Sequence, residues 1–432
     1  MTALRARVED LTHDGQGVAR VDGKVTFIDG ALPGEEVTFR YERRRGRFDE
    51  ARLLEVLEPS PDRVEPRCPH FGTCGGCSLQ HLSGEAQVRR KERRLLNDLV
   101  HIGRVEPRAV LPPLTGPLWG YRHRARLSCR YLGRQGRLGL GFRERRSQRI
   151  ALLSRCEVLA PAVGQRVEAL RAALETLDVR AQVPQVEVAV GDGQAAVVVR
   201  HLAPLGAADR GRLRAFGEGH GIQVQVQPRG PDSVTTLWPD DPPPLAYRLP
   251  AWGLELRFRG TDFIQVNPGI NAGMVALALD LLEVGPGDRV LDLYCGLGNF
   301  TLPMARRADR VLGVEGDPAL VARARENARA NGLDNVEVAV ADLNQTLDGA
   351  PWLDPPPRCV LLDPPRSGAA EVVRVLRPPY AERLVYVSCN PETLARDAGE
   401  LARAHGYRLS RVGILDMFPH TAHVESIALF ER

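Results

Sequence analysis

The amino-acid sequence predicts a multidomain protein with an N-terminal β-barrel, a central α+β domain and a C-terminal α/β domain with a Rossmann-like fold. Its 432 residues are more than one domain usually contains. Short β-rich segments separated by glycine-containing turns fill the first 60 residues, and after residue 260 buried-strand patterns alternate with helix patterns. Such alternation is typical of a doubly wound, mainly parallel sheet. We therefore expect domains over 1–60, 61–260 and 261–432.

The N-terminal segment has the pattern of a small five-stranded, OB-like barrel. An arginine-rich loop occupies 43–47. In these features the segment resembles a TRAM domain, and the resemblance implies an RNA-binding barrel. A group of prolines from Pro59 to Pro66 then indicates a linker. The β-rich runs that predict the barrel lie at 24–28, 36–41 and 51–57.

Positive charge is concentrated in the first 150 residues, although the formal net charge of the chain is only +4. Residues 122–149 contain ten arginines and one glutamate, and a further basic cluster spans 89–94. Arginine suits bidentate contacts with phosphate. Arginines and apolar residues alternate along 124–132, which predicts a strand with one buried face and one basic face that carries Arg124 and Arg126. The charge pattern favours RNA as the partner.

The apolar segments of the sequence are short. None approaches the ~18 residues of a membrane span, and the first ten residues do not resemble a signal peptide. We expect a cytoplasmic protein that does not contact a membrane. Nothing in the sequence indicates an obligate protein partner, so a monomer is expected.

Three cysteines are packed among glycines shortly after the linker. Cys68, Cys74 and Cys77 have the spacing C-x5-C-x2-C, and a fourth thiol, Cys156, lies far downstream. Structural zinc sites usually use two paired CxxC-type motifs. An arrangement of three clustered thiols and one remote thiol is typical of an iron–sulfur cluster. The spacing favours the cluster, with zinc as the alternative.

The rest of the central segment reads as α+β. Ser83 and Gly103 bracket a polar helix over 83–103, which could pack on the catalytic domain. An amphipathic helix is predicted over 162–180. Strands are predicted at 185–190, 195–200 and 222–227.

The C-terminal segment alternates five strand patterns with helix patterns. Helices are predicted over 299–307, 318–331 and 368–377, with a further helix beginning at Pro391. The strands are predicted at 289–294, 311–315, 336–340, 359–363 and 384–387.

Candidate ligand-binding residues follow the first three of these strands. Gly296 and Gly298 allow a tight turn and a close approach to a nucleotide-like ligand. The acid Glu315 ends the second strand, and Asp342 follows the third. A third glycine, needed to cradle a pyrophosphate, is absent. The pattern favours S-adenosylmethionine over NAD.

Cys389 lies where the fifth strand ends and a helix begins. Open α/β sheets bind their ligands at this edge, and a helix N-terminus favours a thiolate. A buried structural thiol is the alternative for any single cysteine, and we read Cys129, Cys295 and Cys359 in that way. The position of Cys389 indicates a nucleophile.

Four motifs identify a family. They are Phe263-Ile264-Gln265-Val266-Asn267-Pro268, Asp363-Pro364-Pro365-Arg366, Ser388-Cys389-Asn390-Pro391 and His420-Thr421-Ala422-His423-Val424-Glu425. With them, residues 263–432 resemble the RNA uracil-5 methyltransferases. Together with the barrel and the four cysteines, the whole chain resembles the bacterial enzymes that act on 23S rRNA.

The resemblance implies a role for each matching residue. Cys389 matches the nucleophile and Glu425 the general base. Cys68, Cys74, Cys77 and Cys156 match the ligands of a [4Fe–4S] cluster. The positions that match S-adenosylmethionine-binding residues are Gln265, Tyr294, Asn299, Glu315, Asp342 and Asp363, beside the glycine pair at 296 and 298.

The chemistry of such a reaction needs these residue types. Attack of a thiolate on C6 of uracil makes C5 nucleophilic toward the methyl group. A base must then remove the proton from C5 so that the thiol can leave. The target base must also leave its stack in the RNA.

Other functions fit the sequence less well. A cytosine-5 RNA methyltransferase carries a Pro-Cys step after the fourth strand, where this chain has Asp363-Pro364-Pro365-Arg366. A catalytically idle RNA-binding assembly factor would not need both Cys389 and Glu425. An iron–sulfur redox protein would need a flavin or nicotinamide motif. A tRNA substrate remains an alternative to 23S rRNA.

Overall fold

The computed structural model describes residues 4–347 and 349–432, which form two compact units. The first unit runs to Arg90 and also contains Gly141–Leu153 and Phe418–Ala422. The second contains Lys91–Leu140, Ser154–Met417 and His423–Arg432. Each unit is described by itself.

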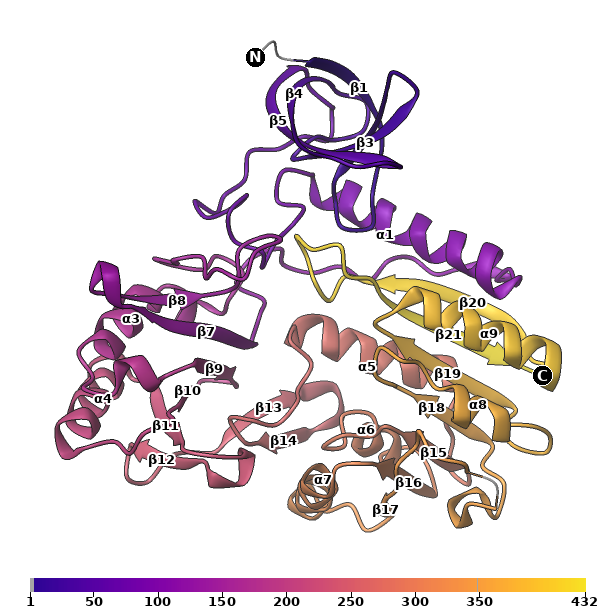
Figure 1. Ribbon diagram of the computed structural model, residues 1–432. Coiled ribbons are helices and arrows are strands. Elements are labelled where there is room, and N and C mark those ends of the chain that lie inside the picture. The colour runs from indigo at the N-terminus through magenta and orange to yellow at the C-terminus, as the bar shows by residue number, and fades with distance from the viewer. Residues whose placement is uncertain (1–3, 348) are drawn as a thin grey trace. The chain divides into compact units, whose positions relative to one another are not determined.

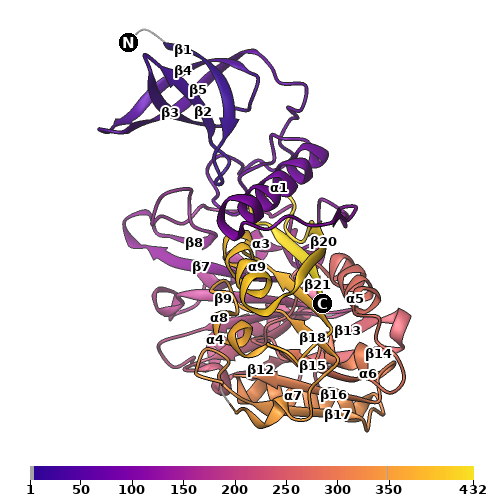
Figure 2. The same cartoon turned by 90° about the vertical axis from the view of Figure 1, so that its right-hand side faces the viewer.

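The first unit contains the expected barrel. Its five strands close in the order β1-β2-β3-β5-β4 (Figures 1 and 2). The predicted β-rich runs correspond to β3, β4 and β5. Alternate side chains, among them Val8, Ile28 and Phe39, fill the barrel interior, as period-two alternation requires. The strands are β1 (Leu4–Leu11), β2 (Gly17–Val21), β3 (Lys24–Asp29), β4 (Glu36–Arg44) and β5 (Phe48–Glu58).

The second unit contains a six-stranded sheet in the order β12-β11-β10-β9-β7-β8. The three strands predicted at 185–190, 195–200 and 222–227 are β9, β10 and β11. The elements of this part are β7 (Arg124–Leu132), β8 (Arg137–Gly141), β9 (Gln185–Val190), β10 (Ala195–Arg200), β11 (Gln223–Gln227), β12 (Thr235–Trp238), α2 (Pro161–Gly164), α3 (Val167–Glu175) and α4 (Ala207–His220).

The single helix predicted over 162–180 is wrong in its extent. The chain forms α2 and α3, which are separated by Gln165 and Arg166, and Arg166 has a non-helical φ of −114°. Gly164 ends α2 so close to the backbone of Cys156 that an added Cβ would lie 2.5 Å from its carbonyl oxygen. This tertiary contact, which the local sequence pattern does not encode, breaks the helix.

A two-stranded hairpin follows the six-stranded sheet. It is formed by β13 (Leu245–Leu249) and β14 (Leu254–Phe258), which pair antiparallel. Amide side chains of α7 (Pro318–Ala330) and of its C-cap anchor the hairpin. Asn327 exchanges hydrogen bonds with the backbone of Arg257, and Asn331 does so with the backbone of Glu255.

The C-terminal half of the second unit is built on an eight-stranded sheet in the order β17-β16-β15-β18-β19-β21-β20-β6. All five predicted strands are present, and they run parallel. Strands β21 and β20 extend the sheet beyond them, and β21 runs antiparallel to both of its neighbours, β19 and β20. The strands are β15 (Arg289–Leu293), β16 (Arg310–Glu315), β17 (Val336–Val340), β18 (Cys359–Leu362), β19 (Arg383–Ser388), β20 (Arg408–Leu415), β21 (Glu425–Glu431) and β6 (Ala109–Val110).

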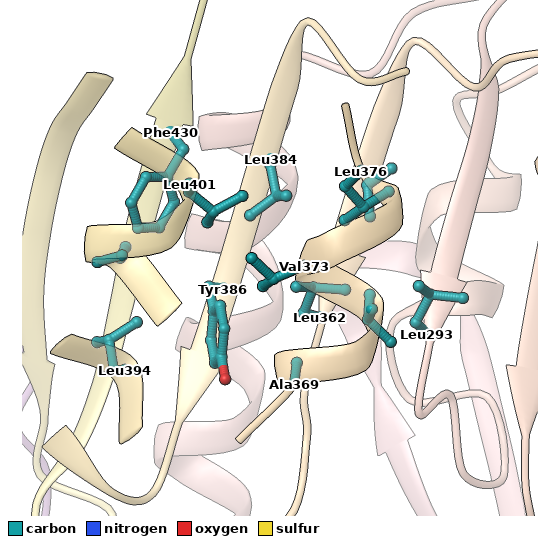
Figure 3. Close-up of a cluster of buried hydrophobic side chains, with 14 of the residues drawn as sticks. Leu293, Leu362, Ala369, Val373, Leu376, Leu384, Tyr386, Leu394, Leu401 and Phe430 are labelled. Atoms are coloured by element: carbon teal, nitrogen blue, oxygen red, sulfur yellow. The ribbon is translucent and has the colours of Figure 1, made fainter. Parts of the chain in front are cut away.

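Helices cover both faces of this sheet, as a doubly wound fold requires. Helix α5 packs against β18, β19 and β21, while α8 and α9 pack on the opposite face (Figures 1 and 3). Between the strands and these two helices lies a buried core in which Leu362, Leu384 and Tyr386 meet Val373 and Leu401 (Figure 3). The helices are α5 (Pro268–Leu282), α6 (Thr301–Ala305), α8 (Ala370–Val375) and α9 (Pro391–His405).

The helix predicted over 83–103 is α1 (Gly84–Asp98), followed by a π-helical turn over Leu99–Gly103. The part of it that belongs to the second unit places Leu95 and Leu99 in the core of the eight-stranded sheet. Gly103 lies against α9, where an added Cβ would come within 2.5 Å of the carbonyl oxygen of Ala395. The buried Lys91 donates a hydrogen bond of 2.7 Å to buried Asp416. The domain boundaries at 60 and 260 stay a prediction.

Over the part of the chain that is described, no helix combines the length and apolar character needed to cross a membrane.

Candidate active site

The carboxyl ends of the parallel strands collect the predicted site residues at one edge of the sheet. Asp363 follows β18, and Cys389 follows β19. Glu315 ends β16, and Asp342 follows β17. Because β15 to β19 are parallel, these ends share one edge. Residues as far apart in the sequence as Glu315 and Cys389 therefore reach the same edge of the sheet, as expected for a ligand-binding site.

Strand pairing brings Cys389 and Glu425 together. Strand β21 runs antiparallel to β19, and Ser388 pairs with Ser426 in the last step of the register. Cys389 directly follows Ser388, and Glu425 directly precedes Ser426. The thiol and the carboxyl therefore extend from the neighbouring ends of two paired strands. The Oγ of Ser426 also donates a hydrogen bond of 3.2 Å to the carbonyl oxygen of Ser388. The backbone thus fixes the spacing of the two side chains.

The local sequence around Cys389 forms the predicted strand-to-helix turn. The side chain of Asn390 caps α9 by accepting a hydrogen bond from the amide of Glu392 at 3.2 Å, and Pro391 takes the first helical position. Asn390 also donates to the carbonyl oxygen of Arg366 at 3.0 Å. This hydrogen bond connects the segment that follows β18 with the segment that follows β19, next to the half-buried Cys389 thiol.

The electrostatics of Cys389 differ from the sequence-based expectation. Burial, followed by the nearby carboxyls of Glu425 and Asp363, raises the pKa of Cys389 to about 11, although Arg366 lowers it. The helix N-terminus does not outweigh these effects. The thiol is therefore protonated near neutral pH in the absence of RNA, and it must lose its proton when it attacks a substrate.

Glu425 is almost completely buried, with an exposed fraction of 4%. Burial and, to a smaller degree, the carboxyl of Asp363 raise the pKa of Glu425 well above its usual range, while Arg366 lowers it. A carboxyl group in such surroundings resists ionisation. Burial therefore favours the protonated form of the Glu425 carboxyl before substrate binds.

Gln265 and Asp363 are in direct contact. The Nε2 of Gln265 donates a hydrogen bond of 3.1 Å to the Oδ2 of Asp363. Burial raises the pKa of Asp363 to about 7, and the hydrogen bond from Gln265 opposes this shift. The segment that carries Gln265 leads into α5, whose N-cap Asn267 accepts a hydrogen bond from the amide of Ile270.

The raised pKa of Asp363 predicts a pH-dependent stability change in Asp363→Asn. The usual pKa is 3.8 and the folded value about 7, so between these values the unfolded chain releases a proton that the folded chain retains. The stability of the wild type therefore falls as the pH rises through this range, and the loss is complete above about pH 7. Asparagine resembles the protonated form and avoids this loss.

We expect the melting temperature of Asp363→Asn, relative to wild type, to rise by about 2 °C or more between pH 5 and pH 8. Thermal unfolding of both proteins at the two pH values measures this. The same change at exposed Asp354 is the control. An equal difference at both pH values would show that Asp363 titrates normally.

The loop that follows β15, residues 294–299, has positive φ angles at its glycines, as the glycine-containing sequence predicts. Tyr294, Gly296 and Gly298 have φ values of 65°, 56° and 100°, and glycine tolerates this region without strain. The amide of Gly296 donates to Oε2 of Glu315 at 3.1 Å, and the amide of Asp317 donates to its Oε1 at 2.9 Å. These bonds hold the Glu315 carboxylate against the loop and leave lone pairs for ligand hydroxyls.

Asn299 and Asp342 complete the predicted cofactor positions. Asn299 is half-buried and hydrogen-bonded to side chains of α5 and the β13–β14 hairpin. Asp342 is exposed and accepts hydrogen bonds from the amide of Asn344 and the side chain of Gln345, which lower its pKa. Both residues lie on loops at the same edge of the sheet.

Three residues of this edge were not predicted to have a role. Arg366 lies near both Cys389 and Glu425, and its guanidinium donates a hydrogen bond of 2.7 Å to Nδ1 of His423. It ends the Asp363-Pro364-Pro365-Arg366 motif, which was a usable signal. Tyr247 and Asn271 contact Asn299, and no sequence pattern marks them.

The basic strand β7 has the predicted alternation of buried and exposed residues, but the role expected for Arg124 is wrong. Arg124 is largely buried, with 13% of its side chain exposed, and it pairs with Glu187 and the backbone of Val188 and Asp262. Arg126 and Arg130 lie on the exposed face. Arg124 is therefore a structural residue.

The cysteine loop belongs to the first unit. Cys68 and Cys74 are half-buried and Cys77 is buried. The backbone turns tightly between them, because the amide of Cys74 donates to the carbonyl oxygen of His70 at 2.9 Å and the amide of Gly76 points at the Cys74 sulfur at 3.4 Å. Cys156 is buried in the second unit. Over residues 4–347 and 349–432, no group of three or more ligand-type side chains is gathered as a metal site.

Two family models match the chain. The model described as tRNA (Uracil-5-)-methyltransferase matches residues 248–350 and 356–432, and that of the TRAM domain matches residues 2–54.

The chain is similar over its full length to curated proteins and to a solved structure. It is 54% identical to the "23S rRNA (uracil(1939)-C(5))-methyltransferase RlmD" of Xylella fastidiosa strain 9a5c, covering 100% of this chain and 98% of that protein. It is 51% identical to the protein of that name from Methylococcus capsulatus, covering 99% and 97%. The crystal structure of the Pyrococcus abyssi tRNA (uracil-54, C5)-methyltransferase in complex with S-adenosyl-L-homocysteine matches with a TM-score of 0.75 and 25% identity, covering 99% and 100%. The chain belongs to the S-adenosylmethionine-dependent RNA uracil-C5-methyltransferase family.

Proposed function

We infer that the protein transfers the methyl group of S-adenosylmethionine to C5 of a uridine in 23S rRNA and so makes 5-methyluridine. Two findings support this function. Full-length relatives with about half of their residues identical carry this activity in their names. In addition, the β19–β21 register places a thiol beside a buried carboxyl, which is the pair that the chemistry requires.

We assign the nucleophile to Cys389. Its sulfur forms a bond to C6 of the uracil, and the electron pair of the C5–C6 double bond moves toward the O4 carbonyl as an enolate. The thiol is protonated in the resting site, where its pKa is about 11, and its proton passes to water in this step. Arg366 is the cation positioned to favour the charged sulfur.

We assign the general base to Glu425. After C5 has accepted the methyl group from S-adenosylmethionine, a base must remove the proton from C5, and the C6–S bond then breaks. Formation of the adduct turns the Cys389 sulfur into a neutral thioether. The thiolate that attacks C6 opposes ionisation of Glu425 by charge repulsion, and this repulsion ends once the neutral thioether has formed. Glu425 can then release its own proton to water before it accepts the proton from C5.

The cofactor-binding residues form three groups in this proposal. The backbone of Gly296 and Gly298 allows close approach of the cofactor, and Glu315 and Asp342 offer oxygen acceptors to hydroxyl and amino groups. Gln265 and Asp363, which contact one another, lie between this group and Cys389 along the strand ends. The others, Tyr294 and Asn299, lie on the glycine loop after β15.

The substrate assignment has a direct test in cells. Deletion of the gene should remove 5-methyluridine from one position of 23S rRNA, and expression of the wild-type chain should restore it. The alternative, a tRNA substrate, predicts the loss in tRNA instead. Mapping 5-methyluridine in both RNAs by mass spectrometry distinguishes them, and intact levels in both would contradict the proposed function.

The exposed face of β7 is proposed to bind the RNA backbone. Arg126→Ala combined with Arg130→Ala should weaken RNA binding and lower the slope of log affinity against log salt by about 0.7–0.9 for each lost phosphate contact. The affinity for S-adenosylhomocysteine should not change. Arg310→Ala, at the amino-terminal end of β16, is a control because that arginine is 60% exposed. An unchanged salt slope in the double variant would show that this face does not contact RNA.

We retain a [4Fe–4S] cluster on Cys68, Cys74, Cys77 and Cys156 as a proposal. The donor chemistry supports it, because four thiolates suit such a cluster and the amide of Gly76 points at one sulfur. Protein purified without oxygen should contain about four irons per chain, and Cys74→Ser should lose them. Cys129→Ser is the matched control at a buried thiol. Stoichiometric zinc without iron would contradict the proposal.

A further inference from the structure

The side chains of Tyr247 and Asn271 form a hydrogen-bonded network with Asn299. The hydroxyl of Tyr247 donates to Oδ1 of Asn299 at 2.9 Å, and Nδ2 of Asn271 donates to the same oxygen at 2.9 Å. In return, Nδ2 of Asn299 donates to Oδ1 of Asn271 at 2.8 Å. Tyr247 and Asn271 are buried, with exposed fractions of 8% and 3%, whereas Asn299 is only half-buried.

The network limits what Asn299 can offer to a ligand. A side-chain amide has an oxygen with two lone pairs and a nitrogen with two N–H groups. Tyr247 and Asn271 occupy both lone pairs of the Asn299 oxygen, and Asn271 takes one of its N–H groups. A single N–H remains. Asn299 is therefore a hydrogen-bond donor only, although an isolated asparagine could act as a donor or an acceptor.

We propose that Tyr247 and Asn271 are positioning residues that hold Asn299 as a fixed hydrogen-bond donor to S-adenosylmethionine. The proposal rests on the proposed function, because it takes Asn299 as a cofactor contact. The ligand chemistry follows from the count of free groups: the atom that meets Asn299 is an oxygen or nitrogen acceptor of the cofactor. A donor group at that position would face another donor.

The surroundings keep the network rigid. Tyr247 lies on β13, and its hairpin partner β14 is tied to Asn327 of α7. The same Asn327 side chain donates to the carbonyl oxygen of Leu297 in the glycine loop at 3.2 Å. The hairpin and the loop are thus joined at two places. Burial also raises the pKa of Tyr247 above its usual value, so its hydroxyl keeps the proton that it donates.

The network also contains one residue, Tyr247, from outside the predicted catalytic domain. Tyr247 precedes residue 261, where the C-terminal domain was expected to begin, and it also precedes the first residue of the family match at 248. Asn271 is on α5, one turn after the segment that holds Gln265. Strand β13 and helix α5 carry no assigned cofactor contact themselves. Through Tyr247 and Asn271 they set the geometry of the glycine loop, which carries the proposed contact at Asn299.

The test measures the affinity for S-adenosylhomocysteine by calorimetry and the kinetic constants for S-adenosylmethionine. Tyr247→Phe should weaken binding about five- to tenfold, because it removes one hydrogen bond and frees a lone pair of Asn299. Asn271→Asp should weaken binding by at least tenfold, because a carboxylate cannot donate to the Asn299 oxygen. At saturating S-adenosylmethionine, kcat should stay within about threefold of wild type, so the loss appears in KM.

Tyr407→Phe is the matched control. Tyr407 has an exposed fraction of 2%, and its hydroxyl donates to the carbonyl oxygens of Tyr380 and Ala381. The variant loses a buried hydrogen bond in the same unit and should be destabilised, yet its affinity for S-adenosylhomocysteine should remain within twofold of wild type. If Tyr247→Phe behaves like this control, with lower thermal stability and unchanged affinity, the positioning role is wrong.

Asn299→Ala separates this inference from the proposed function. If Asn299→Ala binds S-adenosylhomocysteine like wild type, the assignment of Asn299 to the cofactor site is wrong. If Asn299→Ala weakens binding by tenfold or more while Tyr247→Phe and Asn271→Asp bind normally, the cofactor contact stands and the positioning role fails. The proposal requires all three variants to weaken binding.

Discussion

Replacing Glu425 by glutamine is expected to trap a covalent protein–RNA complex that carries the new methyl group. Glutamine has nearly the shape of the glutamate and cannot accept the proton from C5. The attack of Cys389 and the methyl transfer precede this proton removal, so both should still occur. The C6–S bond cannot break without loss of the proton, and turnover should fall by a factor on the order of 10² or more. A denaturing gel with a radiolabelled methyl donor detects the adduct as a protein band that carries both RNA and label.

The control for this variant is Glu431→Gln at the other end of β21. Glu431 pairs with Arg383 there, away from Cys389, and the change should leave turnover close to wild type. Normal turnover in Glu425→Gln would exclude Glu425 as the base. An adduct without the methyl label would show that Glu425 assists methyl transfer itself, and Asp363, with a pKa of about 7, would become the candidate base.

Replacing Cys389 by alanine is expected to abolish both the adduct and methyl transfer. Uracil C5 is a poor nucleophile until a thiolate adds to C6, so the loss should exceed a factor of about 10². The affinities for RNA and S-adenosylhomocysteine should stay close to wild type, because the change removes a single sulfur atom and leaves the other proposed binding residues in place. The comparison is Cys359→Ala, which removes a buried thiol on β18 and should retain methyl transfer.

Residual methylation by Cys389→Ala at a rate near wild type would contradict the covalent route. The adduct of wild-type enzyme with RNA, resolved on the same gel, supplies the reference. A band in Cys389→Ala would mean that another of the eight cysteines is the nucleophile.

The strand ends of the catalytic half could be predicted because each functional residue directly follows a short buried strand. Once five apolar strands alternate with helices, parallel pairing places their carboxyl ends together. The position of Asp363 and Cys389 at one edge with the glycine loop can therefore be predicted without any knowledge of side-chain contacts. The joint role of Cys389 and Glu425 is implied only by the family resemblance, and the antiparallel strand β21, which begins at Glu425, was not predicted.

Contacts between distant segments account for what the sequence did not reveal. Arg124 belongs to a basic stretch, but Glu187 on the neighbouring strand turns it into a buried ion pair. The pKa of Cys389 rises because the thiol is buried and because the carboxyls of Glu425 and Asp363 lie nearby, and together these effects outweigh the local effect of a helix N-terminus. Tyr247 contacts Asn299 across 52 positions, and no periodicity marks such a residue.

The identity of the sulfur that attacks uracil tests the central claim most directly. RNA with 5-fluorouridine at the target has no proton at C5 after methyl transfer, so the wild-type adduct cannot break down. Digestion of this complex and mass spectrometry identify the modified peptide. We expect one peptide, containing Cys389, to carry a nucleotide with both the fluorine and the transferred methyl group. A nucleotide on any other cysteine, or methylated RNA without any protein adduct, would contradict the account.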